Sequence, residues 1–236
     1  MKEIIIVTGA SSGMGREFAM QIEKKYQVDE IWVIARRKER LECLKEKLQT
    51  KVKIFALDLT QKESFEILQE ALFKEKPRVK VLVNCSGYGK LDHYENMSLE
   101  TIENMMNLNM LAVVKMVNTV LPYMHKESHI VNFASCSGYM PIPYLNIYAA
   151  SKAFVLNYSR ALNEELKQFI AENNIKEIYL CGFDTDACVQ KTALDMFEQN
   201  YDVYILKDYC MSHTGEETHN AYINNMKRLI GRDRVI

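Results

Sequence analysis

Three side chains near the middle of the chain could carry out proton transfer. Ser135, Tyr148 and Lys152 lie in the segment NFASCSGYMPIPYLNIYAASK. Tyr148 and Lys152 are four residues apart, so on a helix they share a face, where the ammonium could lower the pKa of the phenol. Such a tyrosine can exchange a proton with an alcohol or a carbonyl while the Ser135 hydroxyl holds the substrate oxygen. A YxxxK pair alone is common by chance, so the surrounding sequence decides whether this pair belongs to an active site.

A glycine-rich turn, TGASSGMG, follows the first apolar run of the chain. The missing side chains permit a tight turn and let a pyrophosphate approach the backbone N–H groups at the positive end of the next helix. The alternative is a tight strand-to-helix turn with no ligand, but the position after a first strand favours a dinucleotide site. The residues expected to line this site are Gly9, Ser11, Ser12, Gly13, Met14 and Gly15.

The second apolar run ends in ARRKERLE, where a dinucleotide site meets the adenosine ribose. A carboxylate there would repel a 2′-phosphate, whereas Ala35 followed by Arg36 and Arg37 offers forked donors to it. The sequence therefore favours NADP(H) over NAD(H). The alternative is that the arginines only decorate a solvated helix start, and it weighs more for Arg37 than for Arg36.

The elements that would position these residues are read from the pattern of apolar runs. Seven runs read as strands and alternate with segments that carry apolar residues at helical spacing: EIIIVTG, EIWVIAR, VKIFALD, VKVLVNC, HIVNFAS, EIYLCGF and DVYILKD. Their near-continuous Val, Ile and Leu content is typical of strands buried on both faces. We expect an α/β fold: one doubly wound, Rossmann-like parallel sheet of about seven strands with helices on both faces.

Composition narrows the expected partners. The 30 basic and 31 acidic residues are interspersed and give a formal charge of −1, which argues against nucleic-acid and membrane partners. No apolar run approaches the roughly 20 residues that span a bilayer, and the amino terminus has no cleavage region, so we expect a cytoplasmic protein. The six cysteines include no CxxC pair, so neither a metal site nor a disulfide framework is expected.

With these motifs in place, residues 1 to about 166 resemble a classical short-chain dehydrogenase/reductase. The resemblance is carried by TGASSGMG, by Asp58 in ALDLT, by NCSG at 84 to 87, where the family usually has Asn-Ala-Gly, and by Asn109, Ser135, Tyr148 and Lys152. It implies catalytic roles for Ser135, Tyr148 and Lys152, with Asn109 supporting a water that relays protons to the lysine. It also implies cofactor contacts, beyond those above, from Asp58, Leu59, Asn84, Gly87, Tyr148 and Lys152.

Residues from about 167 to 236 resemble a different family, the carboxy-terminal part of isochorismatase-like cysteine hydrolases, which include nicotinamidases. The matching pieces are GFDTDACV, TALDMFEQNYDVYILKD and HNAYINNMKRLIG. By resemblance, Cys188 occupies the nucleophile position at a helix amino terminus. The regions that carry that family's catalytic aspartate and lysine are replaced here, so we expect Cys188 to lack its catalytic partners.

The two segments could form one domain, because both families build parallel sheets flanked by helices. A joint near Leu166 and Lys167 would let EIYLCGF add as the sixth strand and DVYILKD as the seventh. We therefore expect residues 1–236 to form one domain, built from segments 1–166 and 167–236. A recombined or engineered chimera is the expected origin, and a natural fusion stays open.

These observations lead to three alternative functions. The first is an NADP(H)-binding oxidoreductase with weak or no turnover, because the substrate side and the usual Pro-Gly grip on the nicotinamide are replaced. The second is a folded chimera without activity, and the third, least favoured, is a cysteine hydrolase of amides that uses Cys188. The helices near 101 to 123 and 148 to 166 could form a homodimer surface, but their apolar stripes would serve equally against the sheet.

Overall fold

The computed structural model describes residues 2–171, 177–198 and 202–236. The chain divides into two compact units, Met1–Ser159 and Arg160–Ile236, and helix α6 (Asn146–Ala171) contains the boundary between them. The predicted joint at Leu166 and Lys167 lies in the same helix, a few residues further on. Residues 172–176, which follow it, are outside the described residues.

The first unit is built on a five-stranded parallel sheet with the strand order β3-β2-β1-β4-β5. The strands are β1 (Glu3–Thr8), β2 (Glu30–Ala35), β3 (Val52–Ala56), β4 (Arg78–Asn84) and β5 (Met124–Asn132). Strand β1 is central, with Ile5 opposite Ile31 of β2 and Val81 of β4. The direction of winding reverses between β1 and β4, which is where open α/β sheets bind ligands.

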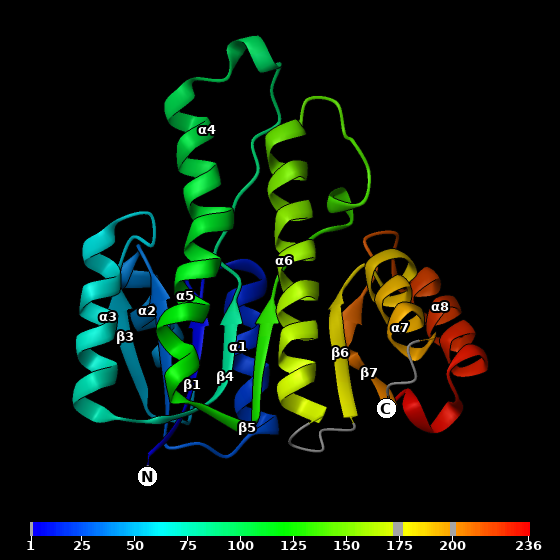
Figure 1. Cartoon of the computed structure of the whole chain (residues 1–236), viewed down its shortest axis with the longest axis horizontal. Coiled ribbons are helices and arrows are strands. Elements are labelled where there is room, and N and C mark those ends of the chain that lie inside the picture. Colours follow the sequence, from blue (N-terminus) through cyan, green and yellow to red (C-terminus); the bar gives the residue numbers. More distant parts are fainter. Residues whose placement is uncertain (1, 172–176, 199–201) are drawn as a thin grey trace. The chain divides into compact units, whose positions relative to one another are not determined.

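The helices of this unit connect successive strands. They are α1 (Gly13–Lys25), α2 (Lys38–Lys45), α3 (Lys62–Glu75), α4 (Leu99–Met106), α5 (Ala112–Val120) and the first part of α6. Short 3₁₀ turns lie at Tyr94–Asn96, Leu121–Tyr123 and Cys136–Gly138. A π-helical stretch, Asn107–Leu111, joins α4 to α5, so the three segments form one long helix (Figure 1).

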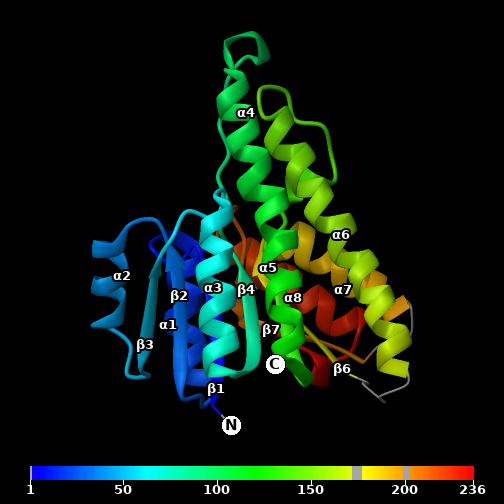
Figure 2. The same cartoon turned by 60° about the vertical axis from the view of Figure 1, so that its left-hand side comes forward.

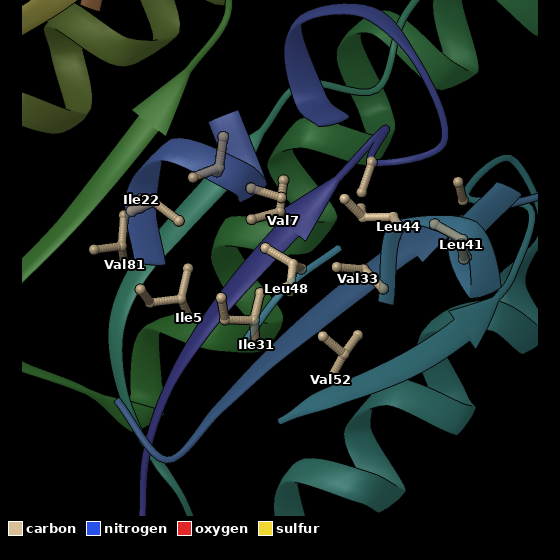
Figure 3. Close-up of a cluster of buried hydrophobic side chains, with 14 residues drawn as sticks. Ile5, Val7, Ile22, Ile31, Val33, Leu41, Leu44, Leu48, Val52 and Val81 are labelled. Carbon is tan, nitrogen blue, oxygen red and sulfur yellow. The ribbon is translucent and has the colours of Figure 1, made fainter. Parts of the chain in front are cut away.

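Helices cover both faces of this sheet. On one face, Ile5, Val7, Ile31 and Val33 pack in a single buried cluster with residues of α1 and α2 (Figure 3). Because side chains alternate along a strand, the buried Ile4, Ile6 and Trp32 point to the other face, where α3 and α5 lie (Figure 2). Burial on both faces explains the continuous apolar runs in the sequence. The predicted α/β, Rossmann-like fold class is confirmed.

The second unit has its own small sheet and its own core. Strands β6 (Glu177–Phe183) and β7 (Asp202–Met211) pair in parallel, and the unit also holds a π-helical stretch (Thr185–Val189), α7 (Gln190–Glu198), α8 (Glu216–Leu229) and a 3₁₀ turn (Arg232–Arg234). Its buried cluster includes Ala193, Val203, Ile205, Ile223 and Met226.

All seven predicted strands are present, but the prediction that they form one continuous sheet is wrong for the described pairings. β6 pairs with β7, and the ladder that begins at β3 ends at β5. An apolar run indicates a strand but does not specify its pairing partners, and α7 and α8 bury the apolar side chains of β6 and β7 in a local cluster that stabilises this pair within its own unit. The single-domain organisation stays a prediction. Among the described residues, no helix is both long enough and apolar enough to cross a membrane.

Candidate active site

The turn after β1 lies at the point where the winding of the sheet reverses. Gly9 has a φ of +70°, and a Cβ there would lie 2.6 Å from the carbonyl oxygen of Cys85, so the position requires glycine. The backbone N–H groups of Cys85 and Ser86 donate to Thr8 Oγ1 at 3.0 and 3.1 Å. The loops that follow β1 and β4 are therefore held against one another.

The amino terminus of α1 is suited to a phosphate group. The N-cap residue Ser12 makes no side-chain capping bond, and the first turn of α1 holds no acidic residue. Gly13 has a φ of +55°, and a Cβ built there would meet no other atom within 4 Å. Ser11 and Gly15 are buried, whereas Met14 is half exposed. Uncapped N–H groups at a positive helix end, beside open space, fit the pyrophosphate of a dinucleotide.

The two arginines after β2 have different surroundings. Arg37 Nη2 donates to Ser11 Oγ at 3.0 Å and to Ser12 Oγ at 2.8 Å, so its guanidinium reaches the glycine-rich turn. Arg36 Nη1 lies 3.8 Å from Asp58 Oδ2, and its side chain is mostly exposed. Sequence reasoning gave Arg37 the smaller weight, because the number of residues after a strand does not reveal which side chain folds back on the turn.

Asp58 and Leu59 lie between β3 and α3. Asp58 Oδ1 accepts from the N–H of Thr60 at 3.0 Å and from the Thr60 hydroxyl at 2.8 Å. Leu59 is buried. This local turn holds the Asp58 carboxylate at the carboxyl end of the sheet, beside Arg36.

Ser135, Tyr148 and Lys152 are brought together in the first unit. Ser135 follows β5, while Tyr148 and Lys152 lie near the start of α6. The Tyr148 hydroxyl is hydrogen-bonded to Ser135, and the Ser137 hydroxyl donates to Ser135 Oγ at 2.8 Å. Lys152 Nζ lies 5.7 Å from the centre of the Tyr148 ring and donates to the carbonyl of Phe133 at 2.7 Å.

The protonation of this group differs from the sequence expectation. Burial raises the pKa of Tyr148, and the hydrogen bond from Ser135 opposes that rise only in part. Burial also lowers the pKa of Lys152 to about 8. The expectation that the pKa of the phenol is lowered is therefore not met, because desolvation of the phenolate outweighs the favourable contacts. Tyr148 is a protonated phenol at neutral pH.

Asn109 lies in the π-helical stretch between α4 and α5 and is fully buried. Its Oδ1 accepts from the N–H of Tyr88 at 3.0 Å, and its Nδ2 donates to the Tyr88 carbonyl at 2.9 Å and to Ser151 Oγ at 3.0 Å. A Cβ at Gly87 would lie 3.0 Å from Asn109 Oδ1 and 3.6 Å from Lys152 Nζ. Asn109 therefore fixes the segment after β4 that passes Lys152, and its predicted water relay stays a prediction.

Asn84 is the last residue of β4 and takes part in a partly buried chain of hydrogen bonds. Its Nδ2 donates to Asn132 Oδ1 at 2.9 Å, and Asn132 Nδ2 donates to Ser159 Oγ at 2.9 Å. Among the described residues, no donor reaches Asn84 Oδ1, although the atom is buried. Sequence patterns did not indicate Asn132, Ser137, Ser159 or the Phe133 carbonyl. The contacts of Asn132, Ser159 and Phe133 join residues that are distant in the chain, and the short-range contact of Ser137 with Ser135 has no motif of its own.

In the second unit, Cys188 is half buried in the π-helical stretch after β6. Nearby, ligand atoms of Asp184, Asp186 and His213 lie within 4.8 Å of one another. Asp184 Oδ1 already accepts from the N–H and from Nδ1 of His213, at 2.9 and 2.6 Å. Side chains of these types can bind a cation, but Asp184 and His213 are hydrogen-bonded to one another here. That the protein binds no metal stays a prediction.

Comparison with known proteins decides the family. The family model described as short chain dehydrogenase matches residues 3–193. The chain belongs to the short-chain dehydrogenase family. It is 34% identical over 169 residues to a 3-ketodihydrosphingosine reductase of Bacteroides thetaiotaomicron, a match that covers 71% of this chain and 60% of that protein. The present chain therefore matches less than two thirds of the length of that reductase.

Solved structures of other members are similar to this chain. The closed form of serine dehydrogenase complexed with NADP+ is 31% identical, with a TM-score of 0.63 over 69% of this chain and 66% of that one. A short-chain dehydrogenase from Sphingobium yanoikuyae in complex with NADPH is 29% identical, with a TM-score of 0.62 over 70% of this chain and 66% of that one.

Proposed function

We propose that this short-chain dehydrogenase is an NADP(H)-dependent oxidoreductase that acts on a carbonyl or alcohol substrate, and that Ser135, Tyr148 and Lys152 are its catalytic residues. The hydrogen bond between Tyr148 and Ser135, with Lys152 beside the Tyr148 ring, carries the proposal. A protonated phenol and a hydroxyl that point to one another can hold a single substrate oxygen between them.

The proposed step transfers a hydride and a proton. The nicotinamide, when bound, supplies the hydride to the carbonyl carbon or accepts it from the alcohol carbon. In reduction, the Tyr148 O–H bond breaks and the proton moves to the substrate oxygen as the hydride reaches carbon, so a carbonyl becomes an alcohol. Ser135 donates a hydrogen bond to that oxygen. Lys152, with a pKa of about 8, can return a proton toward Tyr148.

Preference for NADP(H) is proposed from the arrangement of Arg37, Ser11 and Ser12. A guanidinium bonded to two hydroxyls at the edge of the glycine-rich turn presents several donors to a phosphate. Arg36 lies beside Asp58 and adds positive charge to the same end of the sheet. The similar structures that hold NADP+ or NADPH support this choice.

A second proposal concerns how the chain arose and how fast it turns over substrate. We infer that it joins a dehydrogenase segment to an isochorismatase-like segment, naturally or by engineering, and that turnover is weak. The separate core of β6 and β7 and the unit boundary at Ser159 and Arg160 support a joint within α6. The family match to residue 193 extends past the joint and weighs against it. A folded chimera without activity and an amide hydrolase that uses Cys188 are the alternatives.

The test is a binding and turnover experiment with the whole chain. We expect NADPH to bind more tightly than NADH by calorimetry, and we expect slow NADPH oxidation with a panel of aldehydes and ketones. Tyr148→Phe should bind NADPH normally but lose the oxidation. Absence of NADPH binding would overturn the proposal, while tight binding without turnover would favour the inactive chimera. Amidase activity that Cys188→Ala abolishes would favour the hydrolase. The homodimer and the cytoplasmic location stay predictions.

A further inference from the structure

Two segments of the first unit run outward from Tyr148. Residues 88–94 pass the tyrosine directly, since a Cβ at Gly89 would lie 3.0 Å from the Tyr148 ring. Residues 139–145 precede α6, and the N–H of Asp92 donates to the Tyr144 carbonyl at 3.0 Å. The rings of His93 and Tyr144 meet edge to face at 4.6 Å. Both segments lie beyond the carboxyl ends of the strands (Figures 1 and 2).

These segments expose large apolar side chains. Leu91 is 72% exposed, Tyr94 64%, Met140 58% and Tyr144 51%. We name these four residues the tail surface. Exposed apolar side chains on two segments that flank a reactive residue indicate a binding site.

Residues 88–94 and 139–145 contain few charged side chains: apart from His93, they are Lys90 and Asp92. Residues 139–147, YMPIPYLNI, contain no charged side chain. In the other segment, Lys90 Nζ and Asp92 Oδ2 form an ion pair at 3.2 Å. A bound group that follows the segments away from Tyr148 therefore meets apolar side chains and a neutralised pair of charges.

The backbone of Tyr144 gives a second observation. Its φ is +65°, the left-handed region that a bulky residue rarely adopts. Strained backbone of this kind persists where the surroundings impose it, and it gathers at binding and catalytic sites. The hydrogen bond from Asp92 and the contact with the His93 ring hold Tyr144 in this conformation, so its ring stays at the surface.

We propose that the tail surface binds the hydrocarbon chain of the substrate, so the substrate class is a carbonyl compound, or the corresponding alcohol, with an unbranched apolar chain. The proposal rests on the proposed function, because it places the reacting oxygen at Tyr148. A chain that leaves that oxygen passes Gly89 and then reaches Leu91 and Tyr144. Glycine at position 89 lets the Tyr148 ring lie against this segment, because a Cβ there would be only 3.0 Å from the ring.

Two experiments test the proposal. The first measures kcat/KM with NADPH for methyl ketones of four to ten carbons. Burial of each added methylene should raise kcat/KM by about three- to fourfold until the tail surface is covered. The second experiment measures binding of 1-octanol and 1-butanol to the NADP+-loaded protein by NMR titration. Binding of 1-octanol should be at least about tenfold tighter, since four more methylenes are buried.

Variants separate the tail surface from general hydrophobic effects. Leu91→Asp and Met140→Asp should flatten the dependence on chain length, so that the ratio of kcat/KM for the ten-carbon ketone to kcat/KM for butanone falls. Phe73→Asp is the matched control, since Phe73 is 70% exposed on α3, and it should change neither series.

The outcomes keep the two proposals distinct. Equal kcat/KM across the ketones, or an unchanged slope in Leu91→Asp and Met140→Asp, would overturn the tail surface and leave the oxidoreductase intact. Failure of every ketone to oxidise NADPH would overturn the oxidoreductase instead. In that case the NMR titration decides, because 1-octanol binding that Leu91→Asp removes would still support the tail surface, and binding that it does not remove would refute it.

Discussion

Lys152 donates a 2.7 Å hydrogen bond to the carbonyl of Phe133, the residue that directly follows β5. The bond ties the start of α6 to the carboxyl end of the sheet and places a buried ammonium next to Tyr148. A buried cation held by one carbonyl is costly, which is why its pKa falls to about 8. Burial of this ammonium therefore reduces the stability of the fold at neutral pH, and the hydrogen bond to Phe133 offsets only part of that cost.

The first prediction concerns this cost. The unfolded chain holds the Lys152 proton up to its ordinary pKa, whereas the folded chain loses it near 8, so stability rises with pH between these values. Relative to Lys152→Met, the unmodified protein should gain on the order of 2 kcal/mol between about pH 7 and about pH 9.5. Urea unfolding at both pH values measures the gap. The exposed Lys47→Met is the control, and a gap that does not change with pH would contradict the prediction.

The second prediction concerns Tyr148 as a proton donor. Tyr148→Phe should lower kcat for reduction by roughly 10²- to 10⁴-fold and leave NADPH affinity unchanged, because the ring is retained and only the acid is lost. Since burial raises the pKa of Tyr148, carbonyl reduction should need the phenol and decline only at strongly alkaline pH, while alcohol oxidation should increase there. Steady-state rates in both directions check this. Identical pH profiles for the two directions would be inconsistent with it.

The third prediction separates the two arginines. Arg37→Ala should weaken NADPH binding by roughly 10- to 100-fold and leave NADH binding nearly unchanged, because charge-assisted bonds to a phosphate are lost. Arg36→Ala should have the smaller effect, since Arg36 lies beside Asp58 rather than at the turn. Calorimetry with both cofactors decides the order. Equal affinities of the unmodified protein for NADH and NADPH would defeat both assignments.

The fourth prediction uses two glycines of the same turn. Gly9→Ala should cost more than about 2 kcal/mol of folding stability, because its Cβ would strike the Cys85 carbonyl as well as straining the backbone. Gly13→Ala has open space and should cost only about 1 kcal/mol. It should nevertheless weaken NADPH binding, since its methyl group points into the proposed phosphate site. Thermal unfolding measures the stability of both variants, and calorimetry measures their affinity for NADPH. Normal NADPH binding by Gly13→Ala would show that the phosphate does not bind at this turn.

Much of the first unit could be predicted from sequence because its signals are local. The buried strands are continuous apolar runs, and the spacing of Tyr148 and Lys152 places them on one helix face. The contact of Arg37 with Ser11 and Ser12, by contrast, depends on how a long side chain folds back over another element. The raised pKa of Tyr148 depends on burial, which a spacing rule does not report.

The second unit shows where pattern reasoning stops. The runs at 177–183 and 202–208 predicted strands correctly, but an apolar run does not specify its pairing partner. A strand has two edges, and the described ladder joins one edge of β6 to β7. Likewise, the left-handed backbone of Tyr144 has no local signal, since neither glycine nor asparagine occupies the position.

The central place of β1 in the sheet has a consequence for synthesis of the chain. Residue 5 pairs with residue 31 on one side and with residue 81 on the other. As the chain leaves the ribosome, β1 can join β2 early, but its second edge remains open until β4 emerges. An apolar strand edge left open in this way can capture strands of other chains. Slow closure of the long loop between β1 and β4 should therefore make refolding yield fall as protein concentration rises.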